Sequence, residues 1–390
     1  MGVNVQLRKK LKKGIENKRL TVQQLNEYLE LKNCNPIYDF LNDKKDTFYD
    51  FGALIRLVKG IFPEEEYELM SDYILHLDPN KHSQVLRCGM EYADVNQLDE
   101  LADEVAYRLL NSSNNHSKEW GSIYTLHRKL SKGEMEIHDA IRQTGRIRIH
   151  TPEMLVFSNA MLMYAYLNIG DFHLLKSTFD LLDIDELPEG YVKESYYGRT
   201  ALLHANVSLN ENNLLSARHY SSYVLEKANN NRFMVFGHLT SGNTYVFEDY
   251  DKAKNHYLKG LRYANTNPFH YYKLRLALCF LNNVWKKENE WVDFESNEVT
   301  DRIEVAYYYV NQNEEQKAIK VFQELDSRKI PKDDLGFLFY VKGLLHQEKS
   351  YFYESIEYFK KSGDKMFVNL PLMELKKQGE NERLLQLLTI

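Results

Sequence analysis

Apolar residues recur at helical spacing along most of the chain, and short polar turns interrupt the pattern. From Gly170 onward these turns are commonly separated by roughly 36 to 42 residues, which is the period of stacked helical hairpins. Helix-breaking residues are few, since the chain has only 8 Pro and 18 Gly. The pattern therefore predicts an all-α fold whose main body is an α-helical solenoid.

Small and aromatic residues in this body follow the register of tetratricopeptide-like repeats, which need small residues where paired helices cross. Over 341–362 they lie at offsets 0, 12, 16 and 19, and three further segments match, one of them with a residue missing. The positions are Gly343, Ser355, Phe359 and Ser362; Ala306, Tyr309, Ala318 and Phe322; Ala205 and Ala217; and Gly242, Ala253 and Tyr257. Four segments in register indicate a repeat array, which usually binds peptides or proteins on its concave face.

The first 62 residues have a different pattern, that of four short helices. A basic helix is predicted over 8–17, and Thr21 is a suitable N-cap for a helix over 22–31. Asn35 and Pro36 suit the start of a short third helix, and Thr47 is expected to cap a fourth helix over 48–62. The residues expected to face the core of this bundle are Val22, Leu25, Tyr28, Leu29, Ile37, Phe40 and Leu41.

Two short helices joined by a tight turn and flanked by further helices describe a helix-turn-helix unit. In such units the N-terminal residues of the second helix meet base edges in the major groove. We predict this position for Asn33, Asn35 and Tyr38, because Asn side chains pair well with adenine. The residues predicted to contact the DNA phosphates are Arg8, Lys9, Lys10, Lys12, Lys13, Lys44 and Lys45, with Thr21 and Gln23 at a helix N-terminus.

The charge distribution supports a DNA-binding head. Residues 1–62 hold 12 Lys or Arg against 7 Asp or Glu, whereas the whole chain has 50 against 56 and a net charge of −6. A small basic head on an acidic body suits a head that meets a polyanion. The alternative is a four-helix packing module without DNA contacts, which the acidic Asp39, Asp43 and Asp46 near the second helix favour.

The composition excludes several classes of protein. With 43% apolar and 27% charged residues, the chain is ordinary for a globular protein. It has no run of 18 apolar residues that could span a bilayer, and its N-terminus lacks the apolar core of a secretory signal. Cys34, Cys88 and Cys279 are few and far apart, which is typical of reduced thiols in the cytoplasm.

Motifs of catalysis and cofactor binding are missing from the sequence. It contains no G-x-x-x-x-G-K-[ST] phosphate loop, no G-x-G-x-x-G, H-E-x-x-H or G-x-S-x-G motif, and no EF-hand loop. The 13 His residues are scattered along the chain. We therefore predict a protein that is not an enzyme and that has no cofactor and no metal site.

Polar residues among apolar neighbours form the main candidate binding site. Asn206 and Asn210 lie one helical turn apart, Arg232 opens the next hairpin, and Asn243 lies three turns further along it. Paired Asn side chains can hold an extended peptide by its backbone, and an Arg can clamp a carboxylate. The acidic residues further along that can receive a cation are Glu304 and Asp364. The alternative is hydrogen bonding between adjacent helices.

The chain ends in an apolar helix, GENERLLQLLTI, with four leucines at Leu384, Leu385, Leu387 and Leu388. A terminal repeat normally turns a polar face to water. The pattern leaves two interpretations open, namely burial of these leucines against the preceding helix and a contact between two copies of the chain in a dimer.

Several stretches resemble the arbitrium receptor (AimR) family of temperate phages of bacilli, peptide-sensing regulators that join a helix-turn-helix head to tetratricopeptide-like repeats. These stretches are NPIYDFLN, EYELM, EYAD, LCFLNNVWKKENEWVDFES, FYESIEYFKKSGDK and LPLMELKKQGE. The resemblance covers essentially the whole chain. It implies a homodimer that binds double-stranded operator DNA and a short secreted hexapeptide.

The resemblance also implies roles for individual residues. Glu304 and Asp364 would pair with an arginine of the peptide, and Ile303 is apolar where a relative can carry an amide side chain. The C-terminal helix and its four leucines would contribute to dimerisation. The residues that would surround the C-terminal half of the peptide are Asn206, Asn210, Arg232, Thr240 and Asn243.

We therefore predict a helix-turn-helix DNA-binding domain over 1–62, a tetratricopeptide-like peptide-binding solenoid over 63–365, and C-terminal capping or dimerisation helices over 366–390. Free dimers are expected to bind an inverted-repeat operator and promote transcription of a regulator of lysogeny, until peptide lowers their affinity for DNA. One rival hypothesis is a repeat scaffold or response-regulator inhibitor, controlled by a signalling peptide and without direct DNA binding. Another is a repressor that does not respond to peptide.

Overall fold

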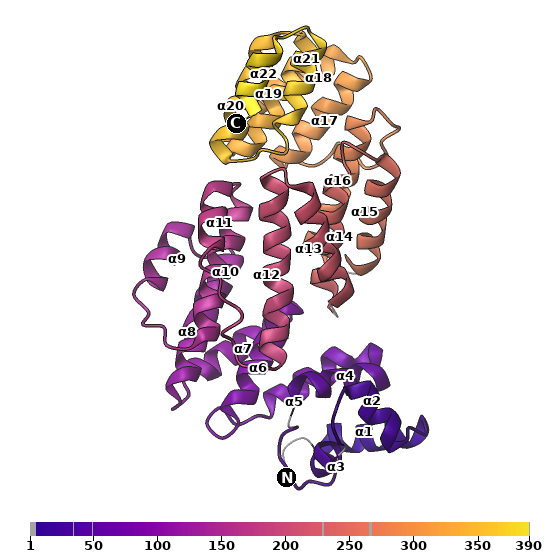
Figure 1. The fold of residues 1–390 in the computed structure, drawn as a ribbon, viewed down its shortest axis with the longest axis vertical. Coiled ribbons are helices and arrows are strands. Elements are labelled where there is room, and N and C mark those ends of the chain that lie inside the picture. The colour runs from indigo at the N-terminus through magenta and orange to yellow at the C-terminus, as the bar shows by residue number, and fades with distance from the viewer. Residues whose placement is uncertain (1–4, 34, 49, 228–229, 265–266, 390) are drawn as a thin grey trace. The chain divides into compact units, whose positions relative to one another are not determined.

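The computed structural model of the chain describes residues 5–33, 35–48, 50–227, 230–264 and 267–389. Within these residues the regular elements are 22 α-helices and one short 3-10 helix, and none is a strand (Figure 1). The prediction of an all-α chain is therefore confirmed. Over the same residues, none of the helices has the length and apolar character that crossing a membrane requires.

The helices form two compact units, and two long helices contribute residues to both. These two are α10 (Pro152–Asn168) and α12 (Tyr191–Asn210). The first unit comprises Met1–Met161 and Asp183–Tyr197, and the second comprises Leu162–Leu182 and Gly198–Ile390. The predicted helix-turn-helix head, residues 1–62, falls in the first unit, and most of the predicted repeats fall in the second.

The remaining helices follow one another with short connections. Those of the first unit are α1 (Val5–Asn17), α2 (Val22–Leu29), α3 (Asn35–Leu41), α4 (Phe51–Ile61), η1 (Pro63–Glu65), α5 (Glu66–Leu75), α6 (Ser83–Val95), α7 (Asp99–Leu110), α8 (Asn115–Ser131) and α9 (Ile137–Thr144). Those of the second unit are α11 (Phe172–Phe179), α13 (Leu214–Lys227), α14 (Asn231–Asn243), α15 (Tyr250–Ala264), α16 (Pro268–Val284), α17 (Val299–Asn311), α18 (Glu315–Asp326), α19 (Lys332–His346), α20 (Lys349–Ser362), α21 (Asn369–Lys377) and α22 (Glu382–Thr389).

The head has the four predicted helices, α1 to α4. Thr21 caps α2 as expected, because its side chain accepts the backbone N–H of Gln24 and the Gln24 side chain accepts that of Thr21. The predicted core residues Leu25, Leu29 and Phe40 are fully buried. The ring centroid of Phe40 lies 5.6 Å from that of Phe48 in an edge-to-face contact.

Two expectations for the head are wrong. Val22 and Tyr28 were expected in the core, but they are 50% and 54% exposed, because the short α2 turns only Leu25 and Leu29 inward. The fourth helix begins at Phe51 and not near Thr47, since the Asp50 carboxylate accepts the N–H of Ala53 at 3.0 Å and caps the helix there.

Most of the predicted repeat positions are buried where paired helices cross, and Tyr309 is half-buried. Ala205, Ala217, Ala306 and Ala318 are each fully buried. In the hairpin of α19 and α20, a Cβ added at Gly343 would lie only 2.6 Å from the Phe352 ring. The backbones of these two helices can therefore approach closely because the crossing residues are small. The alternation of small and aromatic residues thus identifies the hairpins correctly.

The three cysteines were predicted to be reduced thiols. Cys88 is a free, half-buried thiol in α6 and Cys279 is a free, buried thiol in α16. Cys34 lies outside the described residues. Burial raises the pKa of the Cys88 thiol to about 12, so this thiol is not a reactive nucleophile.

Candidate functional site

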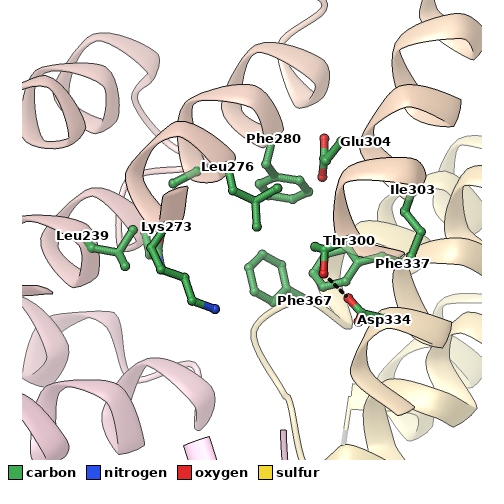
Figure 2. A pocket seen from close by; sticks show the side chains of 12 residues that line it. Leu239, Lys273, Leu276, Phe280, Thr300, Ile303, Glu304, Asp334, Phe337 and Phe367 are labelled. Carbon is green, nitrogen blue, oxygen red and sulfur yellow. Dashed lines mark hydrogen bonds between the residues drawn. The ribbon is translucent and has the colours of Figure 1, made fainter. Parts of the chain in front are cut away.

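A cavity of about 180 Å³ lies inside the second unit, among α14, α16, α17, α19 and the segment that follows α20 (Figure 2). Its apolar lining residues are Leu239, Leu276, Ala277, Phe280, Ile303, Phe337 and Phe367. Its polar lining residues are Asn243, Lys273, Thr300, Glu304 and Asp334. A few polar groups in an apolar cavity fix the orientation of a ligand, so this cavity is the candidate site.

Three phenylalanines form one wall of the cavity. The ring centroid of Phe337 lies 4.8 Å from that of Phe367 and 5.5 Å from that of Phe280. Phe280 and Phe367 are also 5.5 Å apart, and all three contacts are edge-to-face. Each ring holds its neighbours in position, so the wall is formed before a ligand arrives.

Glu304 is a nearly buried carboxyl on the cavity lining, 6% exposed. It accepts a 2.7 Å hydrogen bond from the Asn283 side chain and a weak one from the Cys279 thiol. Burial raises the pKa of Glu304 to about 8. A cation placed against Glu304 would favour its ionised form, so the site suits a positively charged side chain.

Asp364 shapes the turn that brings Phe367 to the cavity. Its Oδ1 accepts hydrogen bonds of 2.9 Å from the backbone N–H groups of Met366 and Phe367. The backbone N–H of Lys365 donates at 2.8 Å to the carbonyl of Asn210. Asn210, at the end of α12, therefore lies against the turn that Asp364 forms. Burial raises the pKa of Asp364 to about 7.

Two charged lining residues, Lys273 and Asp334, were not singled out from the sequence. The Thr300 hydroxyl donates a 3.3 Å hydrogen bond to Asp334 (Figure 2). Burial and the neighbouring Asp333 raise the pKa of Asp334 to about 7, and burial lowers the pKa of Lys273. Both residues occur in helical segments of ordinary composition, so no local signal marks them as part of a site.

The carboxyls do not assemble a metal site. In the part of the chain that the structure describes, no three His, Cys, Asp or Glu side chains come together so that they could hold a metal ion. The cavity offers separate carboxyls in an apolar setting. This arrangement favours an organic cation such as a guanidinium, which can combine a charge contact with stacking on aromatic rings.

Three of the predicted peptide-binding residues, Arg232, Thr240 and Asn243, lie on α14. Asn243 lines the cavity together with Glu304, and its Oδ1 accepts a 2.7 Å hydrogen bond from the Tyr257 hydroxyl. Thr240 is buried one turn earlier and is 2% exposed. The structure therefore brings Asn243 and Glu304 to one space, although they are far apart in sequence.

Arg232 and Asn206 do not line this cavity. The Arg232 guanidinium lies over the ring of Tyr164, with its carbon 5.2 Å from the ring centroid. The Asn206 side chain donates a 2.8 Å hydrogen bond to the carbonyl of Leu202 on its own helix. Both are half-buried in the second unit.

The predicted DNA-contacting residues of the head are mostly at its surface. The exposed ones are Lys9, Lys12, Lys13, Thr21, Gln23, Asn33, Asn35, Tyr38, Lys44 and Lys45. Some already have partners within the head, since the Asn33 side chain accepts the N–H of Asn35 at 3.0 Å and Gln23 donates to Glu27 at 2.9 Å. Lys10 is half-buried and pairs with Glu65 at 2.6 Å.

The prediction that Arg8 contacts a DNA phosphate is wrong. It is buried in the head and is 4% exposed. Its guanidinium forms an ion pair with Asp43, donates a 2.6 Å hydrogen bond to the carbonyl of Lys45, and lies 4.8 Å from the centroid of the Phe40 ring. Arg8 therefore holds the bundle together and is not available to a phosphate.

The C-terminal leucines divide between the two interpretations that the sequence left open. Leu385 is 9% exposed and belongs to the core of the second unit, and Leu388 packs against that core. Leu384 and Leu387 are 38% and 66% exposed. Leu385 is thus buried and Leu388 half-buried against the core, whereas Leu384 and Leu387 face outward.

Known proteins similar to this chain agree on one family. The family model described as AimR transcriptional regulator-like matches residues 66–377. The chain belongs to this family. It is 49% identical over 359 residues to the AimR transcriptional regulator of Bacillus phage phi3T, covering 92% of this chain and 94% of the relative. It is 42% identical over 381 residues to the AimR transcriptional regulator of Bacillus phage SPbeta, covering 97% and 98%.

Solved AimR structures have the same fold. The structure of phAimR-Ligand has a TM-score of 0.79 and 51% sequence identity, covering 84% of this chain and 97% of that one. The structure of SeMet-phAimR has a TM-score of 0.77 and 47% identity, covering 99% and 100%. The chain is therefore an AimR-type transcriptional regulator of phage origin, which confirms the resemblance and the fold class predicted from the sequence.

Proposed function

We propose that the chain is a homodimeric, DNA-binding regulator of the phage lysis–lysogeny decision, controlled by a short communication peptide in the cytoplasm of the bacterial host. The head, residues 1–62, binds the operator. The repeat domain, residues 63–365, binds a hexapeptide, and residues 366–390 cap the array and contribute to dimerisation. Membership in a family of transcriptional regulators supports the DNA-binding part. The similarity to the solved structure of phAimR-Ligand supports the ligand-binding part.

The observation that carries the proposal is the cavity in which Glu304 and Asn243 share one space with three phenylalanines. The peptide would place a cationic side chain against Glu304 and the nearby Asp364 turn, and its C-terminal half along Asn206, Asn210, Thr240 and Arg232. Removing one partner of such a charge-assisted contact costs about 2–5 kcal/mol. Peptide binding would then lower DNA affinity by its coupling energy, about 1–3 kcal/mol.

One titration tests the proposal and its rivals. Binding of operator-region DNA is measured at several salt concentrations, with and without an arginine-containing hexapeptide selected from a panel by thermal shift. We expect log K to fall with log salt by about 0.9 per neutralised phosphate, and peptide to weaken the complex. A peptide-dependent scaffold would bind peptide but show no salt-dependent DNA binding. A repressor that ignores peptide would bind DNA without any thermal shift.

Two variants assign the roles of single residues. Arg232→Ala is expected to abolish the response to peptide while leaving DNA affinity unchanged. Release of DNA at wild-type peptide concentrations would mean that Arg232 is not the carboxylate clamp. Asn35→Ala is expected to weaken binding to the operator more than binding to a random duplex, since base contacts carry the specificity. Equal losses on both duplexes would remove Asn35 from base readout.

A further inference from the structure

A second hollow, of about 450 Å³, lies in the first unit, on the surface formed by α7, α8, α9 and the turn after α9. It contains no residue of the head and none of the peptide cavity described above. Leu110, Leu126 and Ile147 provide its apolar lining, and Lys129, Arg142 and Arg146 provide its charge. The proposed function leaves this hollow without a role.

The nearby carboxylates form ion pairs mainly with cations outside the hollow. Arg128 on α8 and Lys132, which follows the end of α8, pair with Asp103 at 2.9 and 2.6 Å. By contrast, Lys129 and Arg146 are exposed, and the described residues give neither of them an ion pair. The segment 128–148 carries six Lys or Arg against three Asp or Glu, in a chain of net charge −6.

Arg142 is only weakly neutralised. Among the described residues its carboxylate partner is Asp139, at 2.5 Å, in a pair whose side chains are 63% and 45% exposed. Exposed pairs of this kind contribute little, because both groups are well solvated. A carboxylate from another molecule can therefore compete with Asp139, and the hollow presents three cations to a ligand.

The hollow differs from an ordinary solvated basic surface because it also exposes apolar side chains. Leu110 is 40% exposed, and Tyr107, one turn earlier on α7, is 65% exposed. The hydroxyls of Ser122 and Thr125 donate to carbonyls of their own helix, at 2.8 and 2.6 Å. The charged donors available to a ligand are therefore the three cations, placed around exposed apolar surface, and the Gln143 side chain is a neutral donor beside them.

We propose that this hollow docks an acidic amphipathic segment of a partner protein. The segment would bury an apolar side chain on Leu110 and Ile147 and set carboxylates against Lys129, Arg142 and Arg146. Charge complementarity selects an acidic partner, and the apolar lining selects a peptide chain over a nucleic-acid backbone, whose phosphates have no apolar group to cover it. The inference does not depend on the hexapeptide site.

The test uses the full chain and a fluorescein-labelled helical peptide that carries Glu and Leu on one face, compared with a peptide in which Gln replaces each Glu. Anisotropy is expected to show binding of the Glu peptide only, weakened at high salt. Lys129→Glu combined with Arg146→Glu should reduce affinity about tenfold or more, since each lost contact becomes a repulsion. Lys129→Glu alone is compared with Lys118→Glu, which makes the same charge change on the same helix but outside the hollow.

A photo-crosslinking residue at Gln143, which lines the hollow, is expected to attach to the Glu peptide. The proposal is overturned if the double variant and the Lys118 variant bind the Glu peptide equally, or if Gln143 gives no crosslink. It is also overturned if the double variant loses affinity for random duplex DNA and keeps its affinity for the peptide, since the hollow would then contact phosphates. Should the double variant fail to fold, Lys129→Gln with Arg146→Gln replaces it.

Discussion

Asn283 on α16 donates two hydrogen bonds to Glu304 on α17, one of 2.7 Å to the carboxylate and one of 3.1 Å to the backbone carbonyl. Asn289 in turn donates to the Asn283 side chain at 2.9 Å. The Glu304 carboxyl is therefore held in place on the cavity lining before a ligand binds. Such preorganisation lowers the entropy cost of binding, while burial raises the pKa of the Glu304 carboxyl to about 8.

The first prediction concerns the pH dependence of peptide binding. Burial raises the pKa of Glu304 to about 8 and that of Asp364 to about 7. At a pH below these values, a cationic peptide must displace the protons bound to the two carboxyls. Affinity for an arginine-containing hexapeptide should therefore rise from about pH 6 to pH 8 and then level off. Calorimetry in buffers of different ionisation enthalpy should detect proton release at neutral pH.

Glu304→Gln is the matched control for this prediction. It keeps the shape of the side chain and removes its titration, so affinity should fall and the remaining pH dependence should be shallower. If the wild-type dissociation constant is the same at pH 6 and pH 8, the peptide cation does not bind against these carboxyls.

The second prediction concerns stability without peptide. The pKa of Glu304 is raised to about 8 in the folded chain. The stability that its protonated form gives the folded chain is fully present below the unfolded pKa, about 4.3, and is lost as pH rises to about 8. Glu304→Gln does not titrate. The free energy of unfolding of Glu304→Gln, relative to wild type, should therefore increase between those pH values. Urea titrations at several pH values measure it, and a constant difference would contradict the prediction.

Much of the fold could be predicted from the sequence because the register of small and aromatic residues is a local property. Gly343, Ser355 and Phe359 lie at fixed offsets within one hairpin, and the hairpin buries them. Helix ends were predicted less well, since Thr47 and Asp50 are both suitable caps and only the packing of α4 selects Asp50.

The site could be predicted only in part, for a different reason. Asn243 and Glu304 stand out as polar residues in apolar surroundings, and they do line one cavity. Lys273 and Asp334 occur in helical segments of ordinary composition, and only the stacking of separate hairpins brings them to the same space. The partner of Arg8, Asp43, is likewise 35 positions away, which no local spacing can reveal.

The third prediction tests the close helix crossing. Gly343→Ala adds a Cβ 2.6 Å from the Phe352 ring, so the two helices must separate or the ring must move. Overpacking of this kind costs about 1–3 kcal/mol. Gly145→Ala is the control, because its Cβ would have no neighbour closer than 3.5 Å. Thermal unfolding should show a clearly lower melting temperature for Gly343→Ala and little change for Gly145→Ala. Equal melting temperatures for the two variants would contradict the close crossing of α19 and α20.

The fourth prediction separates packing from phosphate contact in the head. Arg8→Ala removes a buried guanidinium that is bonded to Asp43 and to the carbonyl of Lys45, so the head should lose about 1.5–3 kcal/mol of stability. Lys12 is exposed, and Lys12→Ala should leave stability unchanged but reduce the salt slope of DNA binding by about 0.9. If Arg8→Ala melts like wild type and lowers the slope in the same way, Arg8 contacts DNA after all.

The fifth prediction concerns the outward-facing leucines. Leu387 is 66% exposed on α22 while Leu385, two positions earlier, is buried. If this face joins two copies, Leu387→Glu should convert a dimer to a monomer in sedimentation and leave the helix content in circular dichroism unchanged, because the monomer already leaves Leu387 in water. Leu385→Ala should instead cost about 2–5 kcal/mol of stability by opening a cavity. Leu215→Glu, at a leucine that is 79% exposed on α13, is the control and should stay dimeric. Dissociation by Leu215→Glu, with Leu387→Glu unchanged, would move the interface to α13.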